Sequence, residues 1–270
     1  MSRRLGLFAA VLLLAIGLGS QGVARAASAF SDWAAVVVAG DFHAHDGSES
    51  EAFDNARRDV SRGLIGIGFS PANLLQFSVR PERYPDEHLM ISDPDLIGDK
   101  LGELTARAQG GCLLYFTSHG DPDGVVMGPN MLSPAGMALL VDQACGDRPT
   151  VVIISACFSG VFVQPLARPD RMVLTAARSD RSSFGCGSSD RYPYFDACVI
   201  QTLPVASDFA DLGRKVKACV ADKEKATGMT PPSDPQMFVG SELNPLIAFY
   251  TFSHDAAAPD PALSKGRRTP

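Results

Sequence analysis

Four short apolar runs rich in branched residues recur along the chain, and none of them alternates with polar positions. They are residues 34–40, 112–118, 151–156 and 171–177. Runs of this kind are typical of strands that are buried on both faces of a sheet. A further strand is expected at 73–79, and the segments QMFVG and PLIAFYTF near the end of the chain are expected to be closing strands.

Amphipathic stretches lie between these runs and predict helices. The expected helices are 51–69, 94–109, 133–145, 195–203 and 208–226. The third has Ser133 as a candidate N-cap and Pro134 at the first helical position. The charged run at 56–62 is expected on the solvated face of the first helix, and the Pro-rich segment 79–88 is expected to be a loop. Strands that alternate with helices predict an α/β fold with a mainly parallel sheet covered on both faces.

Two chemically reactive residues follow two of the predicted strands. His119 follows the run CLLYFTS and Cys157 follows VVIISA, each beside a small residue. In open α/β sheets, sites form at the carboxyl ends of the strands, so these side chains are expected on one edge. Alone, a cysteine in an apolar run is usually a core residue, and a lone histidine is usually a capping group. Their placement after matching strands favours a nucleophile and its base.

The motifs around these residues resemble those of a known family. LLYFTSHGDPDGVVMG, VVIISACFSGVFV and MVLTAARSDRSSFGC are similar, in this order, to the legumain-type cysteine peptidases, which include the catalytic subunit of the glycosylphosphatidylinositol transamidase. The resemblance implies a caspase-like three-layer α/β/α sandwich without a cofactor or metal. It also implies that Cys157 is the nucleophile and His119 the general acid/base, with oxyanion-hole amides from Gly120 and Cys157.

The same resemblance implies cleavage after asparagine, and sometimes aspartate, but parts of the pocket differ. Ser155 stands where legumain has a glutamate, and the Arg-His pair of legumain has no recognisable counterpart in GDFHAHDGSESEAFDNA. Ser182 and Ser183 keep the polar run of the pocket, and its acidic residue corresponds to Asp196 or, less well, to Asp190. A pocket that has lost charged groups is expected to show a weaker or shifted preference for asparagine.

The segment VVVAGDFHAHDG has two interpretations. His43 and His45, with Asp46, resemble the start of metal-dependent amidohydrolases and could hold zinc. Only three other histidines are present, and none lies in a second metal motif, so a metal is not expected. We instead expect this loop to border the peptidase cleft, where Asp41 or His43 orients His119 or contacts the substrate.

Two other functions use the same residues. A transpeptidase or transamidase would pass the thioester to an amine instead of water. A caspase-like domain that has lost turnover would only bind a partner, but such a domain has no need of both His119 and Cys157.

The N-terminus predicts export to the periplasm or the extracellular space. Arg3 and Arg4 precede the apolar run LGLFAAVLLLAIGLG, and Ala24-Arg25-Ala26 is a candidate cleavage site, so residues 1–26 are expected to be a signal peptide. The expected mature chain has one domain at 27–252, a disordered tail at 253–270 and no membrane span. Its acidic balance disfavours nucleic acid as a partner, and the resemblance to the legumain-type peptidases implies a peptide or protein substrate.

Six cysteines in an exported chain predict at least one disulfide. If Cys157 is a working thiol, a second cysteine must also be unpaired. Two alternative bonds are considered for Cys198, one with Cys186 and one with Cys219.

Overall fold

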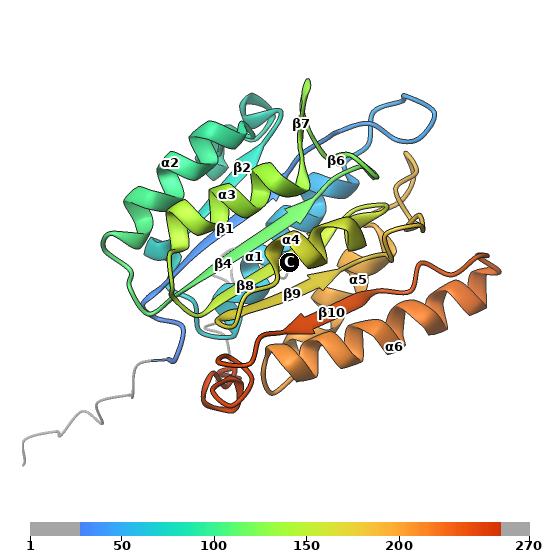
Figure 1. The fold of residues 1–270 in the computed structure, drawn as a ribbon. Helices are drawn as coiled ribbons and strands as arrows, with labels where there is room; N and C mark the ends of the chain where they lie inside the picture. Colours follow the sequence, from blue (N-terminus) through green and yellow to red (C-terminus); the bar gives the residue numbers. More distant parts are fainter. Residues whose placement is uncertain (1–27, 255–270) are drawn as a thin grey trace, which may run out of the picture.

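The computed structural model describes residues 28–254, which are built around a seven-stranded sheet (Figure 1). The strand order across this sheet is β10-β9-β8-β4-β1-β2-β3. Only β10 runs antiparallel to its neighbour. The strands are β1 (Trp33–Ala39), β2 (Leu74–Ser78), β3 (Met90–Ile91), β4 (Gly111–Thr117), β8 (Thr150–Ser155), β9 (Arg171–Thr175) and β10 (Gln236–Val239).

Helices cover both faces of the sheet (Figure 1). One face packs against α1 (Ala52–Gly66), α5 (Tyr194–Thr202) and α6 (Phe209–Thr227). The other packs against α2 (Pro94–Thr105), α3 (Pro134–Cys145) and α4 (Val163–Leu166). Successive residues of β1 alternate between the two cores, Ala35 and Val37 on the first side and Val36 and Val38 on the second. This alternation explains why the strands read as unbroken apolar runs. The predicted three-layer α/β/α arrangement is confirmed.

A second, three-stranded antiparallel sheet follows β4 directly. It consists of β5 (Gly120–Asp121), β6 (Gly124–Met127) and β7 (Asn130–Leu132). The amide of Val126 donates to the carbonyl of His119, which ties this small sheet to the end of β4. Short 3-10 turns occupy the expected loop at 79–88.

Two expectations about the helices and strands are wrong. The segment PLIAFYTF forms a 3-10 turn at Ile247–Phe249 instead of a strand. Its side chains Ile247 and Phe252 are buried in the core beside α6, so its apolar character serves packing and not strand pairing. Arg57 of the charged run at 56–62 is fully buried, because its guanidinium binds Asp54, Gln76 and Glu87.

The expected signal peptide and most of the expected tail lie outside the described residues. The tail was expected to begin at residue 253, but Ser253 and His254 are held on the domain. The amide of Ser253 donates to the carbonyl of Ile67 at 2.9 Å, and Nε2 of His254 lies 2.7 Å from the carbonyl oxygen of Ala206. Between residues 28 and 254, none of the helices combines the length and apolar character needed to cross a membrane.

Two disulfides join neighbouring elements. Cys112–Cys145 links the start of β4 to the end of α3, and Cys198–Cys219 links α5 to α6. Of the two alternatives for Cys198, the bond with Cys186 is therefore wrong. Cys157 and Cys186 are the free cysteines of the described chain.

Candidate active site

The strands β4 and β8 bring His119 and Cys157 to the same edge of the sheet. They pair in parallel, with Thr117 opposite Ser155. His119 and Cys157 each follow two residues later, so both leave the sheet at its carboxyl edge. The imidazole is partly buried and Cys157 is 9% exposed.

The ring of His119 is held by the loop that follows β1. Its Nε2 lies 2.9 Å from the carbonyl oxygen of His43. Because a carbonyl only accepts hydrogen bonds, Nε2 carries the proton and Nδ1 keeps a lone pair. The ring of Phe53 packs edge-on against His119 at a centroid distance of 5.0 Å. The contact with His43 thus leaves Nδ1 as the nitrogen of the neutral ring that can accept a proton.

His43 supplies its main chain to His119 and not its side chain. The His43 ring is 2.8 Å from the carboxylate of Asp41 through Nδ1. The carboxylate of Asp41 also accepts the amides of Phe42 and His43, which shapes the loop.

Cys157 lies beneath a loop that follows β9. The amide of Ser183 donates to the sulfur at 3.2 Å, and the hydroxyl of Ser183 lies 3.5 Å from it. Phe158, the next residue along the chain, has φ of 56° and donates its amide to the carbonyl of Arg181. A bulky residue in the left-handed region is uncommon and is found where the surrounding structure enforces it, often at functional sites. The turn after β8 therefore holds Cys157 against the loop at 181–183.

Gly120 makes a close backbone approach to Cys157. A Cβ at this position would lie 2.6 Å from the carbonyl oxygen of Cys157 and 2.9 Å from Cβ of Ala156. Only a glycine fits there without moving the backbone around Cys157. This places the main chain after His119 directly against the main chain of Cys157.

Asp196 lies in the interior, below the ends of both strands. Its carboxylate accepts hydrogen bonds from the hydroxyls of Tyr115, Thr117 and Ser155. Complete burial raises the pKa of Asp196 to about 6, although the three hydroxyls act in the opposite direction. The resemblance implies that Ser155 and Asp196 belong to the substrate pocket. In the structure both are buried and hydrogen-bonded to each other, and Asp196 also accepts from Tyr115 and Thr117.

The other expected pocket residues lie on the loop between β9 and α5. Ser182 is exposed, Ser183 contacts Cys157, and the carboxylate of Asp190 accepts the amide of Gly187 at 2.8 Å to close a turn.

The structure also places His45 and Cys186 near His119, which the sequence analysis did not predict. Nε2 of His45 lies 2.9 Å from Sγ of Cys186, and the rings of His45 and His119 are 5.2 Å apart. Burial, followed by the charges of Cys157 and Asp190, raises the pKa of Cys186 to about 12.

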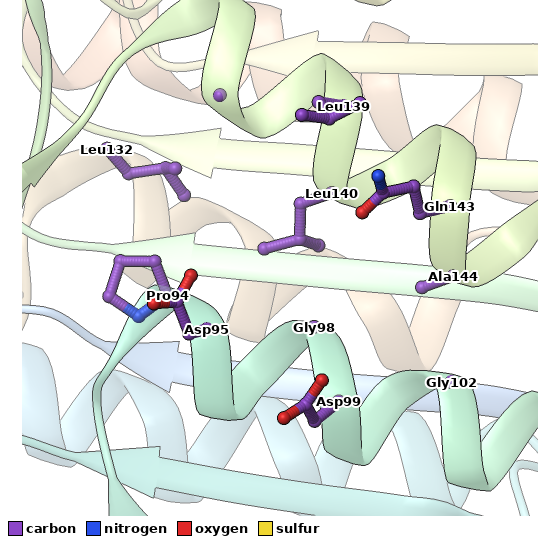
Figure 2. A pocket seen from close by; sticks show the side chains of 11 residues that line it. Pro94, Asp95, Gly98, Asp99, Gly102, Leu132, Leu139, Leu140, Gln143 and Ala144 are labelled. Carbon is purple, nitrogen blue, oxygen red and sulfur yellow. The ribbon is translucent and has the colours of Figure 1, made fainter.

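A hollow of about 560 Å³ borders the site and is lined by residues of the loop after β1 and of the β6–β7 turn, including Asp41, Phe42, His43, Gly128 and Asn130. A larger one, of about 720 Å³, lies between α2 and α3 (Figure 2). The larger hollow contains no histidine or cysteine among its lining residues, so it has no part in the chemistry of the site.

The fold resembles that of a solved protein, and part of the sequence matches a protein family. No curated protein sequence matches the chain significantly. Among solved structures, the chain is similar to caspase-1 from Spodoptera frugiperda, with a TM-score of 0.56 and 14% identity over 78% of this chain and 88% of that one. This likeness confirms the caspase-like fold. Residues 96–216, which contain His119, Gly120 and Cys157, match the Peptidase C13 family, and this match confirms the resemblance to legumain-type cysteine peptidases drawn from the motifs.

Proposed function

We propose that the protein is a cysteine endopeptidase of the legumain type, which cleaves peptide bonds through a thioester on Cys157. One observation carries this proposal. Nε2 of His119 is bound to a main-chain carbonyl, so Nδ1 remains free as a base at the sheet edge where Cys157 lies. The match to the Peptidase C13 family over the same residues supports the assignment.

The reaction needs two proton transfers by His119. Nδ1 takes the thiol proton as Sγ of Cys157 attacks the carbonyl carbon of the scissile bond. The imidazolium stays bound to the carbonyl of His43 through Nε2 and then gives the proton from Nδ1 to the leaving amine. Water next attacks the thioester with the same imidazole as base, which releases the acid product and frees Cys157.

The amides of Gly120 and Cys157 are the proposed donors to the oxyanion. The close approach of these two backbone segments brings both near the reacting carbon. Loss of one such donor typically reduces the rate about 100- to 1000-fold. Ser183 must release the sulfur during attack, since it holds Sγ in the resting structure.

The side chain before the cut is proposed to be read by the loop at 181–190 and the loop at 41–46. Ser155 and Asp196 are interior, so the expected pocket residues that remain on these loops are Ser182, Ser183, Asp190 and His43. The serine hydroxyls suit asparagine, while aspartate is expected as a weaker alternative. Because the carboxylate of Asp190 already accepts the amide of Gly187, the preference for either is expected to be modest.

The test is cleavage of a peptide series that differs only in the residue before a fluorogenic leaving amine. Cys157→Ala and His119→Ala are expected to abolish turnover of the asparagine peptide, because they remove the nucleophile and the base. His88→Asn is the matched control, since His88 is an exposed histidine with φ of 53°, which asparagine tolerates.

A Cys157→Ala variant with unchanged turnover would reject the mechanism.

Alkylation of the thiol separates an enzyme from a binding domain. The catalytic arrangement predicts that iodoacetamide labels Cys157 in the folded protein and that His119→Ala slows this labelling. Labelling at the same rate in both proteins would speak for a domain that only binds.

A further inference from the structure

Three metal-ligating side chains converge beside the candidate dyad. His45, His119 and Cys186 each offer one ligand atom, and these atoms all lie within 4.8 Å of one another. A tetrahedral zinc ion with Zn–N of about 2.0–2.1 Å and Zn–S of about 2.3 Å separates its ligand atoms by about 3.3–3.7 Å. The observed separation of His45 and Cys186 is 2.9 Å, and none of the three separations exceeds 4.8 Å. Shifts on the order of 1 Å would therefore close the three atoms around zinc.

The chemistry of each ligand suits zinc. Metal-ligating histidines typically donate their other ring N–H to a carbonyl or carboxylate, and His119 already has this arrangement with the carbonyl of His43. Cys186 forms no disulfide and is 5% exposed, so it offers a free sulfur in a protected position. Two imidazoles and a thiolate form a donor set for zinc that leaves a fourth position open.

Contacts between the two loops bring His45 and Cys186 together. The hydroxyl of Ser50 donates to the carbonyl of Gly187 at 3.3 Å, which ties the loop of His45 to the loop of Cys186. A bridge between His43 and Glu49 closes the turn that carries His45. Cys186 packs in turn against Phe53 and Ala39. The ligands are thus positioned by contacts that do not depend on a metal.

The charges around the cluster favour a cation. The carboxylate of Asp190 accepts the amide of Gly187, the residue after Cys186, at 2.8 Å, and Asp46 follows His45 directly. Within the described chain, the ring of His43 is bound to Asp41 and lies outside the cluster. The ligand set therefore differs from the His43, His45 and Asp46 set that the sequence suggests.

We propose that His45, His119 and Cys186 bind a zinc ion, and that this ion inhibits the enzyme by occupying Nδ1 of His119. The thiol proton of Cys186 leaves to solvent as the Zn–S bond forms. The inhibitory half of the proposal rests on the proposed function, because Nδ1 is the atom that must take the proton of Cys157. The proposed binding of zinc by the three ligands does not depend on the proposed function.

Binding is tested on the full chain without a histidine tag, with Zn²⁺ in calorimetry and Co²⁺ as the spectroscopic probe. One equivalent of Co²⁺ is expected to give a thiolate-to-cobalt charge-transfer band in the near ultraviolet. Cys186→Ser is expected to remove this band. Both Cys186→Ser and His45→Ala are expected to weaken Zn²⁺ binding by about 100-fold or more. Loss of a group that only hydrogen-bonds to a metal ligand already lowers the affinity for the metal about 10- to 100-fold. His45 is exposed, so its replacement provides a variant that should not disturb the core.

Two further variants sharpen the assignment. Cys157→Ala is expected to keep the band, whereas loss of the band in this variant and not in Cys186→Ser would overturn the ligand set. His88→Asn is expected to bind like the wild type. A wild-type protein that shows neither the band nor a binding heat would overturn the proposal.

The activity measurement compares each protein with and without Zn²⁺. Zn²⁺ at tenfold its dissociation constant is expected to remove most of the peptide cleavage by the wild type and to leave the relative activity of the His45→Ala variant nearly unaffected. Equal inhibition of both would overturn the inhibitory role. A protein that cleaves no peptide yet shows the Cys186-dependent band would contradict the proposed function while supporting the zinc site.

Discussion

At the scale of single residues, the buried carboxylate of Asp196 makes the stability of the protein depend on pH. Its pKa in the folded protein, about 6, lies above the usual value of 3.8, because complete burial disfavours the charged carboxylate. The native state therefore binds this proton more tightly than the unfolded chain. The resulting contribution to stability is full below about pH 4 and is lost as the pH rises to about 6.

Replacement of Asp196 by asparagine tests this coupling. Asparagine keeps the shape and has no charge to bury, so the variant should lack this pH dependence. Relative to Asp196→Asn, the wild type is expected to lose about 2 kcal/mol of unfolding free energy between pH 4 and pH 7. Urea unfolding of both proteins at several pH values measures the difference. A difference that is constant over this range would show that burial does not shift the pKa of Asp196.

Gly120 offers a second test at this scale. In a Gly120→Ala variant, the new methyl group would lie 2.6 Å from the carbonyl oxygen of Cys157, so the backbone of one segment has to move. A displacement of about 1 Å near reacting groups can cost about 100-fold in rate, and a loss of that order in kcat is expected. Gly102→Ala is the control, because a Cβ there would meet nothing within 4 Å. Equal kcat values for the two variants would show that the close approach has no catalytic role.

The sequence predicts single residues well only where strand geometry constrains them. His119 and Cys157 could be placed on one edge because parallel strands end together, and β4 and β8 are neighbours. The contact of His45 with Cys186 spans 141 positions between two irregular loops, for which no periodicity exists. The sequence pattern also gave no sign that Arg57 is buried, because its partners Gln76 and Glu87 come from other segments.

At the scale of elements, apolar periodicity located the central strands and the main helices to within a few residues. It failed at PLIAFYTF, because an apolar segment can be buried as a turn as well as in a strand. It also missed β5, β6 and β7, whose strands have two to four residues and are too short to show a period.

The disulfide between α5 and α6 is a testable feature at this scale. Cys198 and Cys219 are 21 positions apart, so their bond restricts a loop of this length in the unfolded chain. Its removal in a Cys198→Ser and Cys219→Ser double variant is expected to lower the unfolding free energy by about 3 kcal/mol. Chemical denaturation measures this change. Removal of Cys112–Cys145, with a separation of 33, is the comparison and should cost slightly more. A double variant as stable as the wild type would mean that the packing of α5 on α6 alone fixes this pair.

At the scale of the whole molecule, His119 and Cys157 lie at the edge of the central sheet, next to irregular loops. The strands β1, β4 and β8 are central in the sheet, and every residue of the three is buried. They carry the candidate dyad and the loop that orients His119. The loops at 41–50 and 181–193 contain no helix or named strand, and His45 and Ser182 on them are exposed.

Amide hydrogen exchange should reveal this division. The amides of β1, β4 and β8 are expected to exchange only through global unfolding, because they are paired on both sides and covered by two helical layers. The loops at 41–50 and 181–193 are expected to exchange by local opening, at least about 100-fold faster. Zn²⁺ should slow the exchange of both loops together, because the proposed ion joins His45 of one to Cys186 of the other. Protection of one loop alone would contradict that shared site, and fast exchange in β4 or β8 would contradict a rigid base for His119 and Cys157.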